Sequence, residues 1–428
     1  TDVNEQYQLK VKSAVIAVPT NFSLYQRQLI ANAALACGIS SKIIPKTTAV
    51  ALSLAQLHKQ DHYILSIYMD GGSCGAAMFD LESSVLEIVH QKGKELGGCD
   101  IDTQLCGYFA NQFNQKFGLN IFESKRALKK LKNSCEEIKK ILSSQQSAKV
   151  TIEQLYESCD FHMELTRQQF DEICHDIFNS FCDIIKTVCK ESGIQISKTD
   201  EVIFAGGCSK IPKLQEIVKS LVNVDSNHQF NAAEIAVTGA AIYSDQIFRE
   251  TQGKDDLLVI ESNPARFDIV SSQQICSLES NNIIPFKKEL QIIFSENDTI
   301  AVFENNRNVE TLQLRNKVGE VVFTVDIDIM NKIKFSTNCQ FIAKSATQTK
   351  SEDYQRQNDL FLESETKRLE QLKVSLELQQ ILHQFKETLE QNNEKHQKIQ
   401  DLLEKLEDQE TFNQQEMEEQ VKELTEKE

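Results

Sequence analysis

The first 250 residues alternate short apolar runs with longer amphipathic segments, and this alternation constrains the fold more than any other feature. An apolar run at Ala14–Val18 is closed by a proline, and the helical spacing of Ser23–Cys37 ends at Gly38. Short apolar runs closed by proline are typical of buried strands, and glycine commonly follows the last turn of a helix. Ile43 and Ile44 suggest a second short strand, and Ala49–Leu57 is expected to form another helix. This strand–helix alternation predicts a parallel α/β sheet, which begins within residues 1–60.

The pattern changes after residue 62, where three strand-like runs follow one another closely. Gly71-Gly72 and Glu82-Ser83-Ser84 separate these runs, so we expect an antiparallel meander between residues 63 and 92. A strand at Glu201–Ala205 runs directly into Gly206-Gly207. The remaining elements expected in this region are helices over 100–118, 124–143, 167–191, 211–221 and 232–248, and paired strands at 150–155 and 161–165.

Two further changes of composition divide the rest of the chain. Residues 251–256 are polar and lack periodicity, and strand-like alternation dominates from Leu257 to Ala343. Beyond residue 351 Pro and Gly vanish and leucines recur at helical spacing. The expected domains are therefore a remnant of a first α/β lobe over 1–60, a second lobe over 61–250, a small antiparallel β domain over 256–345, and a helical lid or coiled-coil tail over 351–428.

Composition excludes some classes of function. The formal net charge of -17 argues against a general nucleic-acid binder, because phosphate binding needs an excess of basic residues. No run reaches the roughly 18 apolar residues that a membrane-spanning helix needs, so we expect no membrane span. Twelve cysteines lack paired C-x-x-C spacing, and the N-terminus lacks the features of a signal peptide. We therefore expect reduced thiols and a cytoplasmic protein.

Several segments resemble the seventy-kilodalton heat-shock chaperone family, in the order in which that family has them. They are Ala14-Val15-Ile16-Ala17-Val18-Pro19-Thr20, Leu96-Gly97-Gly98-Cys99-Asp100-Ile101-Asp102, Leu128–Ser144, Val202-Ile203-Phe204-Ala205-Gly206-Gly207-Cys208-Ser209-Lys210-Ile211-Pro212 and Gly239-Ala240-Ala241. The resemblance implies actin-like α/β nucleotide-binding lobes, with the first lobe incomplete, followed by the small β domain and the helical tail. It also implies ATP or ADP as the ligand.

The resemblance carries a set of candidate nucleotide-binding positions onto this chain. They are Asp70, Gly72, Gly97, Gly98, Glu136, Lys139, Lys140, Ser143, Gly206, Gly207 and Lys210. The four residues from Glu136 to Ser143 share one helical face by their spacing, and in the family this face clasps adenine and ribose. A solvated face with an ordinary ion pair explains the same spacing.

The glycine motifs also have two interpretations. Glycines between a strand and a helix allow a phosphate to approach the backbone, and a helix N-terminus attracts anions. A tight turn that holds no ligand explains Gly206-Gly207 equally well, and an ordinary hairpin explains Gly71-Gly72.

Departures from the family pattern argue against catalysis. Lys46 stands where the family has the glutamate that orders magnesium-bound water, and a cation there would repel Mg²⁺. Cys208, Lys210 and Ala233 replace a serine, an arginine and an acidic residue. The family's first phosphate loop and catalytic lysine precede the strand that matches Ala14–Val18, and about thirteen residues are too few to hold them. We expect no catalytic residue, no metal site and no magnesium-assisted hydrolysis.

Two classes of function remain open. The chain is either a chaperone-like protein that binds unfolded clients without hydrolysing ATP, or a scaffold subunit of a larger protein assembly. An uncovered sheet edge in the first lobe predicts that another chain covers residues 1–60. The alternative is an ATP-dependent chaperone ATPase whose N-terminal segment, with its Asp-x-Gly-Thr-Thr loop, is missing from this chain.

Overall fold

The computed structural model divides the chain into two compact units, Thr1–Gln348 and Thr349–Glu428. The residues it describes are 11–56, 61–222, 231–249, 256–271, 274–294, 299–305, 307–314, 319–328, 333–337 and 341–344, together with 378, 402 and 420–422. The helical tail predicted over 351–428 therefore lies almost wholly outside the described residues and stays a prediction.

The first described segment forms the predicted parallel strand pair. Strand β1 (Ser13–Val18) pairs in parallel with β2 (Ser40–Pro45), and helix α2 (Leu24–Ala36) connects them. Ser23 caps α2 by accepting a hydrogen bond from the backbone N–H of Gln26, whose side chain bonds back to the N–H of Ser23. This reciprocal cap explains why the predicted start of the helix is accurate to one residue.

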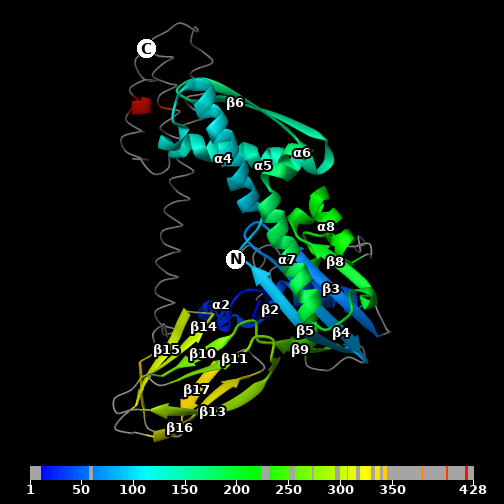
Figure 1. Cartoon of the computed structure of the whole chain (residues 1–428), viewed down its shortest axis with the longest axis vertical. Coiled ribbons are helices and arrows are strands. Elements are labelled where there is room, and N and C mark those ends of the chain that lie inside the picture. The colour runs from blue at the N-terminus through cyan, green and yellow to red at the C-terminus, as the bar shows by residue number, and fades with distance from the viewer. Residues whose placement is uncertain are drawn as a thin grey trace. The chain divides into compact units, whose positions relative to one another are not determined.

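A six-stranded mixed sheet forms the centre of the first unit, in the order β12-β9-β5-β4-β3-β8. The predicted meander is its middle, because β4 pairs antiparallel with both β3 and β5, and β8 adds to β3 in parallel. Strands β9 and β12 come from the segment that we assigned to the β domain, yet β9 pairs in parallel with β5 (Figure 1). The strands are β3 (His62–Met69), β4 (Cys74–Glu82), β5 (Val85–Lys94), β8 (Glu201–Ala205), β9 (Leu258–Ser262) and β12 (Ile283–Ile284).

Helices cover both faces of this sheet because its central strands carry apolar residues on both sides. On one face Leu65 and Ile67 pack in a core with residues of α4, α5, α7 and α8. On the other face Ile64 and Tyr68 pack against α3 and the start of α9. The helices are α3 (Lys46–Ala55), α4 (Gly98–Phe117), α5 (Lys125–Ser144), α7 (His175–Glu191), α8 (Pro212–Val222) and α9 (Ile235–Phe248).

Two expectations about helices need correction. Helix α3 begins at Lys46, three residues before the predicted Ala49. The single helix expected over 167–191 is two helices, α6 (Arg167–Ile173) and α7, separated by Cys174, whose φ of -94° and ψ of 10° are not helical. Periodicity missed this break because the apolar spacing continues across it. Strands β6 (Ser147–Tyr156) and β7 (Cys159–Thr166) form the expected antiparallel pair.

The strands after β9 and β12 form two antiparallel sheets. A five-stranded sheet has the order β11-β10-β14-β15-β18, and a three-stranded sheet has the order β13-β16-β17. These strands are β10 (Phe267–Val270), β11 (Ile275–Leu278), β13 (Phe286–Phe294), β14 (Thr299–Glu304), β15 (Arg307–Leu314), β16 (Gly319–Ile327), β17 (Ile333–Thr337) and β18 (Phe341–Lys344). Residues such as Phe267, Val302 and Phe323 form their shared core.

Buried polar contacts join these β strands to the first segment. The carboxylate of Glu304, at the end of β14, accepts hydrogen bonds from the N–H groups of Leu24 at 2.6 Å and Tyr25 at 3.2 Å. It therefore lies at the N-terminus of α2, where the helix dipole favours a negative charge. In the central sheet, Glu261 on β9 forms a buried ion pair with Lys42 on β2 at 3.1 Å. Within the described part of the chain, no helix is both long enough and apolar enough to cross a membrane.

Candidate functional site

Three turns meet at the C-terminal ends of β3 and β8. The turn at Asp70 follows β3, Gly97 and Gly98 start α4, and Gly206 follows β8. The N–H of Gly98 donates to the carbonyl of Asp70 at 2.8 Å, and the N–H of Cys99 donates to that of Gly71 at 2.7 Å. Backbone hydrogen bonds therefore hold the hairpin turn against the start of α4.

The close approach of these turns explains two of the glycines. Gly206 has a φ of +90°, and a Cβ there would lie 2.4 Å from the carbonyl oxygen of Met69 and 2.7 Å from Oδ1 of Asp70. A Cβ at Gly97 would lie 2.5 Å from backbone atoms of Asp70 and Gly71. No larger residue fits at either position without a backbone shift, so backbone packing alone requires both glycines.

Lys139 reaches the same turns from α5. Its Nζ donates to the carbonyl of Gly98 at 3.0 Å and pairs with the carboxylate of Asp102 at 2.8 Å. Both side chains are largely buried, with 13 % and 7 % exposed. Burial raises the pKa of Asp102 above its usual value and outweighs the opposite effect of Lys139. Lys139 therefore holds α4 to α5 and is not a free cation.

An ion pair between Lys46 and Asp70 closes the other side of the site. The Nζ of Lys46, at the first position of α3, lies 2.5 Å from Oδ2 of Asp70 and 5.6 Å from the ring centre of Tyr68. Tyr68 is buried and its hydroxyl accepts a hydrogen bond from the N–H of Thr20 at 2.9 Å. Burial raises the pKa of Tyr68 to about 12, so its ring is neutral beside the ammonium group.

The other predicted residues lie at the solvent-facing side. Gly72 and Gly207 are exposed, and a Cβ at either would contact nothing within 4 Å. Glu136 and Lys140 form an exposed ion pair at 2.7 Å, which lowers the pKa of Glu136 below its usual value. The hydroxyl of Ser143 donates to the carbonyl of Lys139 at 3.2 Å. Lys210 is exposed at the end of the turn that follows Gly207.

The structure thus gathers Asp70, Gly97, Gly98, Lys139 and Gly206 into one cluster, in which hydrogen bonds join Asp70, Gly98 and Lys139 and close backbone packing places Gly97 and Gly206. The predicted helical face is only partly available, because Lys139 points inward while Glu136 and Lys140 face solvent.

Two members of the cluster were not predicted as site residues. Cys208 lies with its Sγ 3.7 Å from the carbonyl oxygen of Asp70. Asp102 could have been found, because it shares a helical face with the apolar residues Leu105 and Phe109, and an acid on such a face needs a buried partner.

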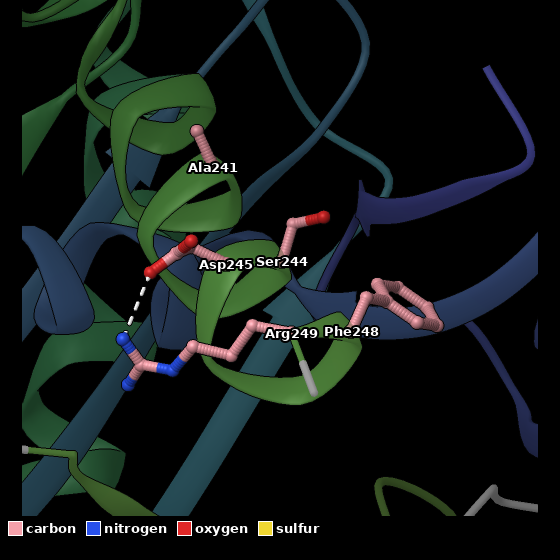
Figure 2. A pocket seen from close by; sticks show the side chains of 5 residues that line it. All are labelled: Ala241, Ser244, Asp245, Phe248 and Arg249. Carbon is pink, nitrogen blue, oxygen red and sulfur yellow. Dashed lines mark hydrogen bonds and ion pairs between the residues drawn. The ribbon is translucent and has the colours of Figure 1, made fainter. Parts of the chain in front are cut away.

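A hollow on the surface of α9 shares no lining residue with this cluster. Figure 2 shows its side chains, which come from Ala241, Ser244, Asp245, Phe248 and Arg249. The guanidinium of Arg249 pairs with the carboxylate of Asp245 at 3.2 Å across one turn of the helix (Figure 2). None of the predicted nucleotide-binding residues lines this hollow.

The residues present fit the adenosine part of a nucleotide better than its phosphates. The carboxylate of Glu136 is exposed and can accept ribose hydroxyls. The two lysines nearest the turns, Lys46 and Lys139, already hold carboxylates. Among the residues that the structure describes, no three His, Cys, Asp or Glu side chains gather in a way that could hold a metal ion.

Comparison with known proteins supports the resemblance found in the sequence. The profile of the family described as Hsp70 protein matches residues 1–428. The chain belongs to the Hsp70 family. The heat shock 70 kDa protein of Penicillium citrinum is 30 % identical over 309 residues, which cover 69 % of this chain and 61 % of that protein. That of Trichophyton rubrum is 31 % identical over 310 residues, covering 69 % of this chain and 47 % of the relative.

A more distant Hsp70 relative shows the same partial coverage. Heat shock cognate 70 kDa protein 3 of Dictyostelium discoideum is 28 % identical over 336 residues, which cover 76 % of this chain and 52 % of that protein. The chain therefore spans about half the length of the curated Hsp70 relatives that it matches.

Proposed function

We propose that this Hsp70-family chain is a chaperone subunit that does not hydrolyse ATP and that works by binding other proteins. The Lys46–Asp70 ion pair is the observation that supports this proposal most directly. It places a positive charge on the turn that the family resemblance assigns to phosphate contact.

The ion pair opposes metal-assisted catalysis in two ways. Phosphoryl transfer depends on cations and carboxylates that are positioned around the phosphates. The ammonium group of Lys46 repels a divalent cation at this turn. It also occupies Oδ2 of Asp70, which leaves fewer lone pairs of this carboxylate for metal-bound water. The pair is 27 % and 32 % exposed, so solvent only partly screens it.

Nucleotide contact without turnover is the second part of the proposal. Glu136, Lys140 and Ser143 would hold the adenosine, and the exposed backbone at Gly72 and Gly207 would lie beside the phosphates. Asp70, Gly97, Gly98, Lys139 and Gly206 would hold these elements in place through the contacts that they make with one another, and Lys210 would lie at the rim. A bound ATP or ADP would supply a link between α5 and the turns after β3 and β8.

Protein binding is the third part. Ile275 on β11 is 67 % exposed and Ile293 on β13 is 50 % exposed. Apolar side chains on strands can contact the side chains of an extended polypeptide. Within the described residues β1 pairs only with β2, so a further chain that covers residues 1–60 would complete this edge.

Isothermal titration with ADP and ATP, with and without magnesium, tests the proposal together with a phosphate-release assay. We expect nucleotide affinity to change less than about threefold with magnesium, and no phosphate release above the background of contaminating chaperones. Lys46→Gln frees Asp70 and should make binding sensitive to magnesium. Lys213→Gln is the matched control, because Lys213 forms an exposed pair with Glu216 at 3.0 Å.

Different results separate the two candidate functions. Magnesium-dependent binding with turnover by the unmodified chain would favour the ATP-dependent chaperone ATPase instead. Absence of any nucleotide binding would refute the assignment of adenosine-contact residues and would favour a scaffold role.

A further inference from the structure

Helices α4 and α5 pack antiparallel, and their register brings two cysteines together. Asp102 on α4 pairs with Lys139 on α5. Cys106 lies four residues after Asp102, and Cys135 lies four residues before Lys139. Residues four apart share one face of a helix, so the two cysteines form the next layer of the same interface.

The contacts of the thiols agree with this register. Cys106 packs against the core that contains Cys135, and its Sγ lies 3.9 Å from the carbonyl oxygen of Leu128 on α5. Cys106 is half-buried and Cys135 is buried in the core between the helices. A small oxidant can therefore reach the sulfur of Cys106, and the buried sulfur of Cys135 lies beside it in the same interface.

The electrostatics make Cys106 the more reactive of the two. The hydrogen bond from Cys135 and the nearby charge of Lys132 lower the pKa of Cys106 to about 7. The same hydrogen bond, with burial, raises the pKa of Cys135 above its usual value. A thiolate is the form of cysteine that reacts with peroxide, so Cys106 is the expected point of attack.

We propose that Cys106 and Cys135 form a redox-responsive modification site, at which hydrogen peroxide converts the two thiols into an intrachain disulfide between α4 and α5. The oxidation itself needs no bound nucleotide. It lies one helical turn from the Lys139–Asp102 pair, so the disulfide fixes the two helices that carry this pair.

The chemistry has two balanced steps. The thiolate of Cys106 attacks one peroxide oxygen, the O–O bond breaks, and the released hydroxide takes up a proton to become water, which leaves a sulfenic acid on Cys106. The sulfur of Cys135 then attacks the Cys106 sulfur, the S–O bond breaks, and the hydroxyl leaves as water with the proton of Cys135. The two thiols lose two electrons in total, and one hydrogen peroxide becomes two waters.

Mass spectrometry after peroxide treatment tests the site directly in the full chain. Trypsin places Cys106 in the peptide 95–116 and Cys135 in the peptide 133–139. We expect these peptides to be linked without reducing agent and separate with it. The peptide 95–116 also contains Cys99, so the linkage is mapped in a Cys99→Ser background.

Two further variants make the test specific. Cys106→Ser should abolish the link, whereas Cys182→Ser, which alters another half-buried cysteine on α7, should leave it intact. In the Cys99→Ser chain, oxidation should raise the midpoint temperature of unfolding by on the order of 5 °C, because closing a loop constrains the unfolded chain. Cys106→Ser should lose this shift. The proposal is wrong if Cys135 stays reduced while Cys106 is oxidised, or if Cys135 links to a different cysteine.

Discussion

Replacing Lys139 with methionine should destabilise the contact between α4 and α5 strongly. The change leaves the carboxylate of Asp102 buried without its partner and removes the donor to the carbonyl of Gly98. Breaking a buried ion pair in this way costs about 3–5 kcal/mol, and the 13 % and 7 % exposures place this pair near the lower limit. We expect the midpoint temperature to fall by about 5–10 °C in thermal unfolding followed by circular dichroism.

A neighbouring lysine provides the matched control for this prediction. Lys140 lies on the same helix, but its pair with Glu136 is 70 % and 49 % exposed. Lys140→Met should therefore leave the unfolding midpoint unchanged within error. The double change Lys139→Met with Asp102→Leu should recover most of the lost stability, since no buried charge is left. Equal midpoints for Lys139→Met and Lys140→Met would refute the assignment of a stabilising buried pair.

Two further predictions concern the turns and the β strands. Gly206→Ala should destabilise the chain by about 2 kcal/mol or more in denaturant unfolding, because its φ of +90° and the carbonyl of Met69 both oppose a Cβ. Gly207 faces open space, so Gly207→Ala should have little effect. Equal losses of stability in the two variants would contradict this account. Burial raises the pKa of Glu304 above its unfolded value of 4.5, although hydrogen bonds from α2 act in the opposite direction. The protonated carboxyl of Glu304 therefore contributes most to stability below pH 4.5, and this contribution is lost as the pH rises through the raised pKa. Glu304→Gln should flatten this part of the stability–pH curve, and an unaltered curve would show that another group titrates there.

Local signals in the sequence were sufficient for most of the elements. The cap at Ser23 marks the start of α2, and the left-handed Gly38, with a φ of +76°, marks its end. Each signal involves only residues close together in the sequence. The break at Cys174 was missed because the apolar pattern that predicts helix continues on both sides of it.

Long-range pairing explains what the sequence could not show. Strand β9 looks like part of the β domain in sequence, but it pairs with β5, which lies more than 160 residues earlier, and no local pattern encodes that partner. The site shows the same limit. Lys46 was recognised as a departure from the family, but its pairing with Asp70 depends on how α3 packs beside β3.

The interpretation of the glycines changed for the same reason. Gly97 and Gly206 match the family's glycine motifs, and the sequence allowed either a ligand or a tight turn. The structure shows protein backbone against both, and open space at the neighbouring Gly72 and Gly207. A glycine motif therefore marks close backbone approach, and only the packed structure identifies which atoms approach.

The most direct test of the account is a single-turnover assay with γ-labelled ATP and magnesium, in which the full chain is in excess and has been purified away from contaminating chaperones. A chain in which Lys46 pairs with Asp70 at the turn after β3 should leave the label on the nucleotide for as long as buffer alone does. Label released at a rate that scales with the amount of this protein, and that persists through further purification, would contradict the claim.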